Sequence, residues 1–410
     1  MRDRSSEEVS TPPASSPPAQ TVQLNARASG FARRGRPWFY RDDLAGGEVA
    51  PARLVRCIDE HGRDLGLGFT ASNKLALRLC GPWAREGLPA REDFFRVRLD
   101  AAIAARAERL GAEHGARLVH GEADWLPGLV VDRYADVLVL QVTSEFVERS
   151  LDAIVPFLAE RLGASAVVAR NDVATRRREG LDEYVELLHG DRKTEVEIVE
   201  GDVRHMVRPF AGHKTGFYLD QRPARALVQR LAKGKRVLDL FCYQGGFSLH
   251  ALRGGAVSAL AVDQSSEALE RAQRDADRNG LAGLQTRCGD AFDLLRALRE
   301  EGQSYDLIVL DPPAFAKSKR ELPGAERGYR DLNRQALRLL APHGQLLTCT
   351  CSHHVGMLRF EELVRQAAAG LPFRVGLRQR LGAGDDHPAL LTHPESEYLK
   401  VLRLQRIEGA

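Results

Sequence analysis

An acid and a pair of glycines stand at the end of a predicted β-strand in the second half of the chain. Residues 236–240 form a short apolar run that contains Asp239, and Gly245 and Gly246 follow before a helical pattern begins. Glycines at such a turn allow the backbone to approach a ligand closely, as in nucleotide sites. The next predicted strand ends in Asp263, 18 positions after Gly245, near the spacing at which a carboxylate binds a ribose diol.

The same spacing occurs in dinucleotide-binding proteins, but the glycine pattern disfavours NAD. Residues 244–247, Gln-Gly-Gly-Phe, lack the third glycine of the GxGxxG motif. Two further acids follow, Asp290 after a glycine and Asp311 before two prolines. A glycine loop under the methionine part of S-adenosylmethionine, an acid for its ribose and an acid for its adenine amine occur in this order in class I methyltransferases. Each acid alone is equally compatible with a helix N-cap.

Four motifs make the likeness specific. They are GHKTGFYLDQR at residues 212–222, LDLFCYQGGF at 238–247, DPPAF at 311–315 and TCS at 350–352. Together they resemble the 23S rRNA cytosine-5 methyltransferases that carry an N-terminal PUA domain, and the resemblance extends from about residue 22 onward. It implies an enzyme that uses S-adenosylmethionine, modifies ribosomal RNA and can form a homodimer.

The resemblance also implies which residues bind the cofactor. Residues 214–222 are expected to help close the cofactor pocket, and Gln244 departs from the family, in which threonine occupies this position. The predicted cofactor-binding residues are Tyr218, Asp220, Gln221, Asp239, Phe241, Tyr243, Gly245, Gly246, Asp263, Asp290, Ala291 and Asp311.

Cys351 is the predicted catalytic nucleophile. The C5 atom of cytosine is a poor nucleophile because its electrons belong to the aromatic ring, so methylation there requires prior addition of another group at C6. A cysteine thiolate is suited to that addition and leaves again by elimination. Cys351 follows the predicted strand 345–349, at the sheet edge where open α/β proteins bind ligands. An inert buried thiol is the alternative, and it is our interpretation of Cys57, Cys80 and Cys288.

Asp311 is the second predicted catalytic residue. Its carboxyl group, held before two prolines, is placed to hydrogen-bond the N3 and N4 edge of a flipped cytosine while Cys351 adds to C6. The base that removes the C5 proton has no signature in the sequence.

Cysteines and histidines at 349–354 also raise the question of zinc, because thiolates and imidazoles are its preferred ligands. Cys349 and Cys351 share a face only if the strand continues through both, and the chain has no second CxxC or HxxxH half-site. We therefore predict no metal site.

Two basic segments predict contacts with RNA, because arginine and lysine neutralise phosphates and neighbouring aromatic rings can stack on bases. One segment lies around residues 27–41 and contains no acid before Asp42; the other directly follows Asp311. Trp38 and Phe39, which lie among these arginines, are also compatible with the core of a small domain. The predicted RNA-binding residues are Arg33, Arg34, Arg36, Lys317, Lys319 and Arg320.

Strands that alternate with long helices are expected to position the catalytic residues. After about residue 205 this alternation predicts an α/β fold with a parallel, doubly wound, Rossmann-like sheet of the class I methyltransferase type. Its strands are nearly continuous apolar runs, as burial on both faces requires. They are expected at residues 236–240, 258–263, 306–311 and 345–349.

The rest of the chain divides into a tail and two further domains. Residues 1–20, rich in proline and serine, are predicted to be disordered. Residues 21–99 are expected to form a β-rich, PUA-like RNA-binding domain with strands near 22–24, 52–58, 75–79 and 94–99. Residues 100–204 are expected to form a mixed α+β domain with a helix at 101–117 and strands at 129–131, 137–142 and 166–169, and residues 205–410 the methyltransferase domain.

Composition limits the class of protein. Hydrophobic residues make up 43% and charged residues 28%, which is typical of globular proteins and excludes a wholly disordered chain. No apolar run reaches the roughly 18 residues that span a bilayer, and the first residues lack the apolar centre of a signal peptide. We expect a cytoplasmic protein that has reduced thiols and no membrane partner. The net charge of +3 does not by itself indicate an RNA partner.

Two other functions fit part of the pattern. Methyltransferases that act on amino groups use Asp-Pro-Pro-aromatic motifs. Here Ala314 follows the prolines and the aromatic residue is displaced to Phe315. Such enzymes also do not need a nucleophile such as Cys351. A non-catalytic RNA-binding or ribosome-assembly protein would tolerate a damaged cofactor loop, whereas Gly245, Gly246 and Asp263 are all present.

Overall fold

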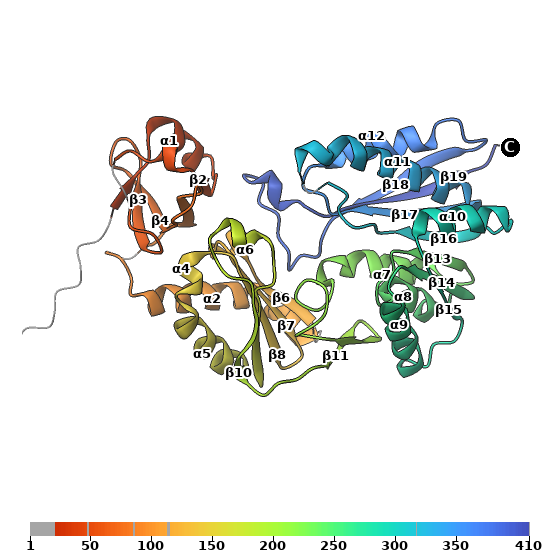
Figure 1. The fold of residues 1–410 in the computed structure, drawn as a ribbon, viewed down its shortest axis with the longest axis horizontal. Helices are drawn as coiled ribbons and strands as arrows, with labels where there is room; N and C mark the ends of the chain where they lie inside the picture. The colour runs from red at the N-terminus through yellow and green to blue at the C-terminus, as the bar shows by residue number, and fades with distance from the viewer. Residues whose placement is uncertain (1–20, 47–48, 85–86, 113–114, 317, 410) are drawn as a thin grey trace, which may run out of the picture.

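The computed structural model describes residues 21–409 except residues 47–48, 85–86, 113–114 and 317. The expected disordered tail, residues 1–20, lies outside the described residues. Within the described part, sheets of five, five and seven strands follow one another along the chain, and a two-stranded ribbon lies between the second and the third (Figure 1).

The first sheet belongs to a small β-rich module, as expected. Phe39 is fully buried in its core, whereas Trp38 is half-buried and donates a hydrogen bond from Nε1 to Glu122 Oε1 at 2.8 Å. Helix α1 (Ala26–Arg33) begins at Asn25, whose side chain caps it by accepting from Ala28 N. The strands, in sheet order, are β1 (Thr21–Gln23), β3 (Leu54–Ile58), β4 (Asp64–Thr70), β5 (Leu77–Gly81) and β2 (Trp38–Phe39); the short helix η1 (Arg41–Asp43) follows β2.

The strand expected at residues 94–99 is wrong, because this segment lies within helix α2 (Arg91–Ala104). Arg96 and Arg98 alternate there with apolar residues and imitate the period of a strand. Over a longer window the buried positions recur at helical spacing, which decides the structure. They are Phe94, Phe95, Leu99, Ala102 and Ile103.

Helix α2 also crosses the division that we expected between residues 99 and 100. Its aromatic residues pack against the first sheet, with ring centroids 5.4 Å apart for Phe69 and Phe94, and against the middle domain, with 5.7 Å for Phe95 and Phe146. One hydrophobic core therefore joins the first two sheets.

The middle domain is a mixed α+β unit, as expected. Its strands, in sheet order, are β10 (Val185–Gly190), β9 (Ala166–Arg170), β8 (Val137–Val142), β7 (Leu129–Tyr134) and β6 (Gly115–His120). Strands β8 and β9 are parallel and the other pairs are antiparallel. Its remaining elements are α3 (Ala107–Ala112), η2 (Gly121–Asp124), α4 (Glu145–Glu148), α5 (Leu151–Leu162), α6 (Thr175–Arg178) and the ribbon β11 (Val196–Glu200) with β12 (Val203–Val207).

The third sheet contains all four strands that we expected after residue 205. Two of them have the expected bounds, because apolar runs buried on both faces begin and end abruptly in the sequence. The strands, in sheet order, are β15 (Leu284–Cys288), β14 (Ser258–Asp263), β13 (Arg236–Leu240), β16 (Tyr305–Leu310), β17 (Leu340–Thr350), β19 (Lys400–Ile407) and β18 (Arg374–Leu381).

Strands β13 to β17 are parallel, but β19 runs antiparallel to β17 and to β18. The four strands that we predicted are parallel, as expected, and the antiparallel strand β19 makes the whole sheet mixed. The chain returns from β18 to β19 through residues 382–399, without a crossover helix, so β19 enters the sheet in the opposite direction.

Helices cover both faces of the third sheet. Val237 and Val309 pack on one face with α7 (Arg222–Leu231) and α8 (Gly246–Arg253), while Leu238 and Ile308 pack on the other. On that other face lie α10 (Ala291–Glu300), α11 (Leu322–Arg338) and α12 (Met357–Ala368); α9 (Ser266–Arg278) follows β14. The strand order reverses between β13 and β16, and open α/β sheets bind ligands beyond the carboxyl ends of the strands at such a point.

Among the described residues, no helix combines the length and the apolar character that a membrane span requires.

Candidate active site

A cavity of about 440 Å³ lies beyond the carboxyl ends of β13, β14 and β16. We call it the cofactor cavity, because nine of the twelve residues predicted to bind the cofactor line it. It is lined by His213, Lys214, Phe217, Tyr218, Asp220, Gln221, Arg225, Phe241, Cys242, Tyr243, Gln244, Gly246, Phe247, Asp263, Gln264, Asp290, Phe292, Asp311, Pro312, Pro313, Phe315, Cys351 and Leu399. Three residues predicted to bind cofactor, Asp239, Gly245 and Ala291, do not line it.

The loop after β13 has an unusual backbone. Phe241, Tyr243 and Gly245 have φ angles of 61°, 50° and 69°, in the left-handed region that non-glycine residues seldom adopt. Gly245 caps α8, and a Cβ atom there would lie 2.8 Å from Ala272 Cβ. Gly245 is therefore needed for packing against α9, and Gly246 is the glycine that faces the cavity.

The Asp239 side chain anchors this loop through hydrogen bonds to Ser248. Its Oδ2 atom accepts hydrogen bonds from Ser248 N at 3.0 Å and Ser248 Oγ at 2.8 Å, which fixes the start of α8. Its Oδ1 atom is buried without a partner, and burial raises the pKa of the carboxyl group to about 7. A buried oxygen without a donor beside a cavity suits a ligand that brings one.

Asp263 and Asp290 line the cavity from neighbouring strand ends. Asp263 accepts from Tyr243 N at 2.8 Å and from Ser265 N at 2.9 Å. Asp290 Oδ1 accepts from Phe292 N at 2.9 Å and so caps α10. Asp290 is thus a helix N-cap and a cavity residue at once, so the two interpretations of this acid are compatible.

Residues 213–218 cover one side of the cavity. The rings of His213 and Tyr243 stack with centroids 4.2 Å apart and an interplanar angle of 11°. Tyr218 lies beside them, 3.1 Å from His213 Nδ1 through its hydroxyl group, and Lys214 Nζ lies 4.3 Å from the Tyr218 ring centroid. The segment therefore contacts the loop after β13 through side chains.

Two carboxyl groups whose pKa values shift in opposite directions line the cavity. Asp220 Oδ2 accepts from Lys214 Nζ and from the Tyr398 hydroxyl group, each at 2.7 Å, and Asp220 Oδ1 has no partner. Although burial opposes ionisation, Lys214 and these hydrogen bonds hold the pKa of Asp220 below its usual range. Asp311 Oδ2 accepts from Gln221 Nε2 at 2.8 Å, and burial together with the negative charge of Asp220 raises the pKa of Asp311 to about 6.

Cys351 lines the same cavity, directly after the end of β17. Burial and the negative charge of Asp311 raise the pKa of its thiol, which Lys214 partly offsets. Lys400 Nζ donates to Ser352 O at 2.9 Å and thereby fixes the residue next to Cys351. Cys349 is fully buried in the sheet and does not line the cavity.

The other cysteines differ from expectation at one position. Cys57 and Cys80 are buried, as expected, but Cys288 is exposed. It ends β15, the edge strand of the third sheet, where one side has no neighbouring strand to cover it.

Among the described residues, the group with metal-ligand spacing is Glu200, His205 and His250, not the cluster at 349–354. Both carboxylate oxygens of Glu200 already accept from Arg225, at 2.6 and 2.7 Å. Glu200 is therefore already engaged in an ion pair, and the positive charge of the Arg225 guanidinium group opposes the binding of a cation.

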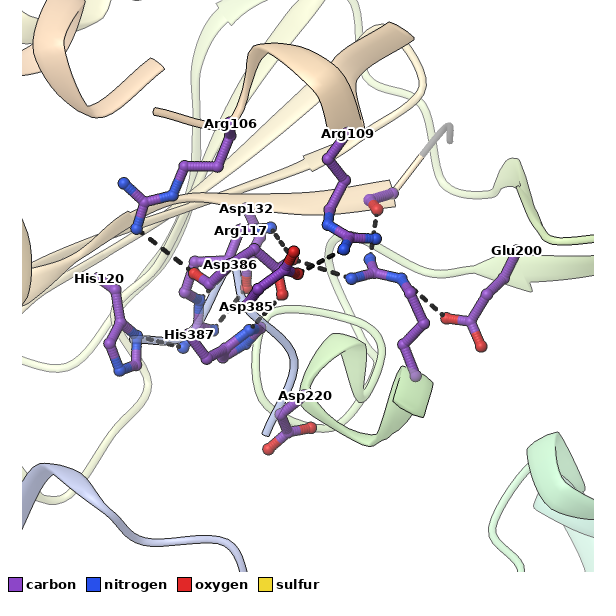
Figure 2. Close-up of polar contacts among 12 residues, drawn as sticks. Arg106, Arg109, Arg117, His120, Asp132, Glu200, Asp220, Asp385, Asp386 and His387 are labelled. Carbon is purple, nitrogen blue, oxygen red and sulfur yellow. Dashed lines mark hydrogen bonds and ion pairs between the residues drawn. The ribbon is translucent and has the colours of Figure 1, made fainter. Parts of the chain in front are cut away.

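A polar network joins the segment 382–399 to the middle domain and to the start of α7 (Figure 2). At its centre Asp386, in the segment 382–399, accepts from Arg117 N at 3.0 Å, from Arg222 Nη1 at 3.1 Å and from His387 Nδ1 at 2.9 Å. Arg222 also donates to Gly115 O at 2.6 Å. Because Tyr398 reaches Asp220 from the same segment, residues 382–399 connect the middle domain, the start of α7 and the cavity.

The predicted RNA-binding arginines of the first module differ in what their side chains contact. Arg33 lies 2.8 Å from Asp59 Oδ2 and 3.0 Å from Glu60 Oε1, acids that are distant in sequence. Arg34 and Arg36 lie over the Phe31 ring at 4.9 and 5.2 Å. The charge of Arg33 is therefore compensated within the module.

The second basic segment follows the cavity residue Phe315. Arg320 and Arg327 are exposed. Lys317 lies outside the described residues, and for Lys319 the structure describes the backbone, which begins the short helix η4 (Lys319–Glu321).

Several cavity residues were not predicted from the sequence, among them Arg225, Phe292 and Leu399. Arg225 is placed by its ion pair with Glu200, 25 positions earlier, for which the local pattern gives no signal. Phe292 was detectable, because it follows Asp290 within the first turn of α10.

Comparisons with known proteins agree with this architecture. Residues 116–390 match the family described as S-adenosylmethionine-dependent methyltransferase, and residues 22–80 match the PUA-like domain. The expected fold class and cofactor are thereby confirmed.

Relatives match over nearly the whole chain. Ribosomal RNA large subunit methyltransferase I of Aeromonas hydrophila is 44% identical over 394 residues, covering 94% of this chain and 98% of that protein. The protein of the same name from Shewanella denitrificans is 39% identical over 378 residues, covering 90% of this chain and 95% of its own length.

Solved structures share the fold. SMU.776, crystallised in complex with SAH, has a TM-score of 0.82 at 22% identity and covers 94% of this chain and 100% of its own. A SAM-dependent methyltransferase from Streptococcus mutans gives a TM-score of 0.80 at 22% identity, with the same coverage. The chain therefore belongs to the S-adenosylmethionine-dependent methyltransferases with an N-terminal PUA-like domain, in the family of ribosomal RNA large subunit methyltransferase I.

Proposed function

We propose that the protein forms 5-methylcytosine in 23S ribosomal RNA through a covalent bond between Cys351 and C6 of the base. The names of its relatives supply the class of substrate, RNA of the large ribosomal subunit. The observation that carries the carbon chemistry is the position of Cys351, which lines one cavity with Asp311 and with the acids expected to hold the cofactor.

The residues of the cavity fit S-adenosylmethionine. Asp263 offers carboxylate oxygens for the ribose hydroxyl groups, and Asp290 offers one for the adenine amine. Of the cavity residues, Asp220 and Gln221 carry buried acceptors without a partner, Oδ1 and Oε1, which suit the ammonium group and other donors of a bound ligand. When bound, this cofactor supplies an electrophilic methyl group.

Cys351 supplies the nucleophile that cytosine needs. Its thiolate forms a bond to C6, and the electron pair of the C5–C6 double bond becomes available at C5. After C5 has been methylated, a base removes the C5 proton, the C5–C6 double bond forms again, and the thiolate leaves with the electrons of the S–C6 bond. Because the thiol pKa is raised, Cys351 must lose its proton to a base before it attacks.

Asp311 is proposed to orient the base. The Gln221 amide fixes one of its carboxyl oxygens, and the raised pKa makes the protonated form accessible near neutral pH. A protonated Asp311 can donate to N3 of cytosine and accept from N4, which withdraws charge from the ring while Cys351 adds to C6.

Bisulfite sequencing of 23S rRNA tests this proposal, because 5-methylcytosine resists deamination. In a strain that lacks the gene, we expect one protected cytosine to be lost. The wild-type gene should restore it and a gene encoding Cys351→Ala should not. Unchanged protection would contradict the proposal, and a methyl group found on nitrogen by nucleoside mass spectrometry would favour the amino-group alternative.

The RNA contacts of Arg34 and Arg36, the division of the chain into the expected domains, a homodimer and a cytoplasmic location stay predictions. A compensated Arg33 makes Arg34 and Arg36 the stronger RNA-binding candidates in the first module.

A further inference from the structure

An open groove of about 550 Å³ adjoins the cofactor cavity. Phe292 and Phe315 line both spaces, so the groove begins at the mouth of the cavity. From there it follows η4 and the first two turns of α11, where Arg320, Arg327 and Gly328 line it. We call it the α11 groove.

Two arginines of the α11 groove are available to a ligand. Arg320 and Arg327 are exposed, and within the described part of the chain neither has an ion-pair or hydrogen-bond partner. Further along α11, Arg330 and Arg334 instead donate to Gln366 of α12. The groove also contains Glu321, so its arginines outnumber its acids by two to one. This charge favours an anionic ligand.

The groove also offers an aromatic ring. Phe315 is half-buried, and its ring packs on Tyr329 with centroids 4.8 Å apart and an interplanar angle of 52°. A Cβ atom at Gly328 would lie 3.5 Å from Phe315 Cδ2, so a larger residue at 328 would cover this ring and fill the groove. The glycine leaves that side of Phe315 open to a planar group.

We infer that the α11 groove binds the nucleotide that flanks the target nucleotide in the RNA strand. This inference rests on the proposed function, because a base held in the cofactor cavity must be joined by a phosphodiester to a neighbour at the cavity mouth. The base of that neighbour stacks on Phe315, and Arg320 and Arg327 neutralise its phosphates. The groove thus binds the RNA strand next to the target nucleotide and adds affinity for single-stranded RNA.

Two variants test the groove, one by removing its positive charge and the other by filling its space. Arg320→Ala/Arg327→Ala removes both charges, and Gly328→Leu fills the groove while leucine favours the helix at this position. Arg338→Ala is the control for a lost charge, since Arg338 is exposed at the other end of α11. The probe is deproteinised 23S rRNA from a strain that lacks the gene, and dissociation constants are measured by filter binding over a range of salt concentrations.

Both groove variants should raise the dissociation constant for RNA on the order of 10-fold, by loss of charge or of stacking. The double arginine variant should also reduce the salt slope by roughly 1.4, the value for two phosphates of a single strand. Arg338→Ala should behave as wild type, and all variants should bind S-adenosylmethionine with wild-type affinity in calorimetry. Wild-type RNA affinity and salt slope in the groove variants would overturn the inference.

Nucleoside mass spectrometry of the wild-type product separates this result from a failure of the proposed function. If the methyl group lies on nitrogen, the carbon chemistry is wrong, whereas the RNA affinities of the variants still decide whether the groove holds RNA.

Discussion

The hydroxyl group of Tyr398 donates a hydrogen bond of 2.7 Å to Asp220 Oδ2, across 178 positions of the sequence. Lys214 Nζ binds the same oxygen, so Asp220 Oδ1 is left for a ligand at the wall of the cofactor cavity. The C-terminal segment 382–399 thereby positions a carboxylate that belongs to the segment before α7.

Tyr398→Phe should therefore weaken cofactor binding as well as the fold. Loss of the donor should lower the free energy of unfolding by about 1–3 kcal/mol and raise the dissociation constant for S-adenosylmethionine roughly 10-fold. Tyr184→Phe is the matched control, because the Tyr184 hydroxyl donates to Glu148 Oε1, also at 2.7 Å, in the middle domain. It should lose stability but keep cofactor affinity. Equal cofactor affinities for both variants in calorimetry would remove Tyr398 from the site.

Asp386→Ala should be among the most destabilising changes in the segment 382–399. The Asp386 side chain is 0% exposed, and its removal leaves the Arg222 guanidinium group buried without this partner, which costs about 3–5 kcal/mol. The neighbouring Asp385 also pairs with an arginine, Arg109, but its side chain is 76% exposed. Asp385→Ala should therefore cost less than about 1 kcal/mol. Denaturant unfolding that gave the two variants the same stability would refute the role of the buried network.

Asp311→Asn should make Cys351 reactive at lower pH. Above a pH of about 6 the Asp311 carboxyl group is ionised, and its negative charge opposes the Cys351 thiolate; asparagine removes this charge but can still accept from Gln221. Alkylation of Cys351 by iodoacetamide, measured by mass spectrometry as a function of pH, should shift toward lower pH in the variant. The exposed Cys288 provides an internal reference in each sample. A shift toward higher pH, or none, would mean that the two groups do not interact as described.

The sequence was informative where the signal is local. Strands β13 and β14 have the bounds expected from their apolar runs, because a strand buried on both faces cannot include polar residues without cost. Asp263 and Asp290 follow strands and line the cavity, as their positions predict. The run at 94–99 was misassigned because Arg96 and Arg98 produce alternation over a window too short to show the helical period of α2.

Contacts between distant segments could not be predicted. Tyr398 and Asp386 act on Asp220 and Arg222, and nothing near 386–398 in the sequence indicates these partners. The ion pairs of Arg33 have the same origin, since Asp59 and Glu60 lie 26 and 27 positions away in the sequence. Gly245 was predicted to face the ligand, whereas its contact with Ala272 depends on how α9 packs against α8.

The covalent bond between Cys351 and cytosine is the central claim, and 23S rRNA transcribed with 5-fluorocytidine tests it most directly. Fluorine at C5 cannot leave as a proton does, so the adduct should persist after methyl transfer and migrate as a protein–RNA complex in denaturing electrophoresis. Wild type and Cys349→Ala should both form the complex, because Cys349 is buried in the sheet, while Cys351→Ala should form none and lose methylation. A Cys351→Ala enzyme that still methylates normally would contradict the account.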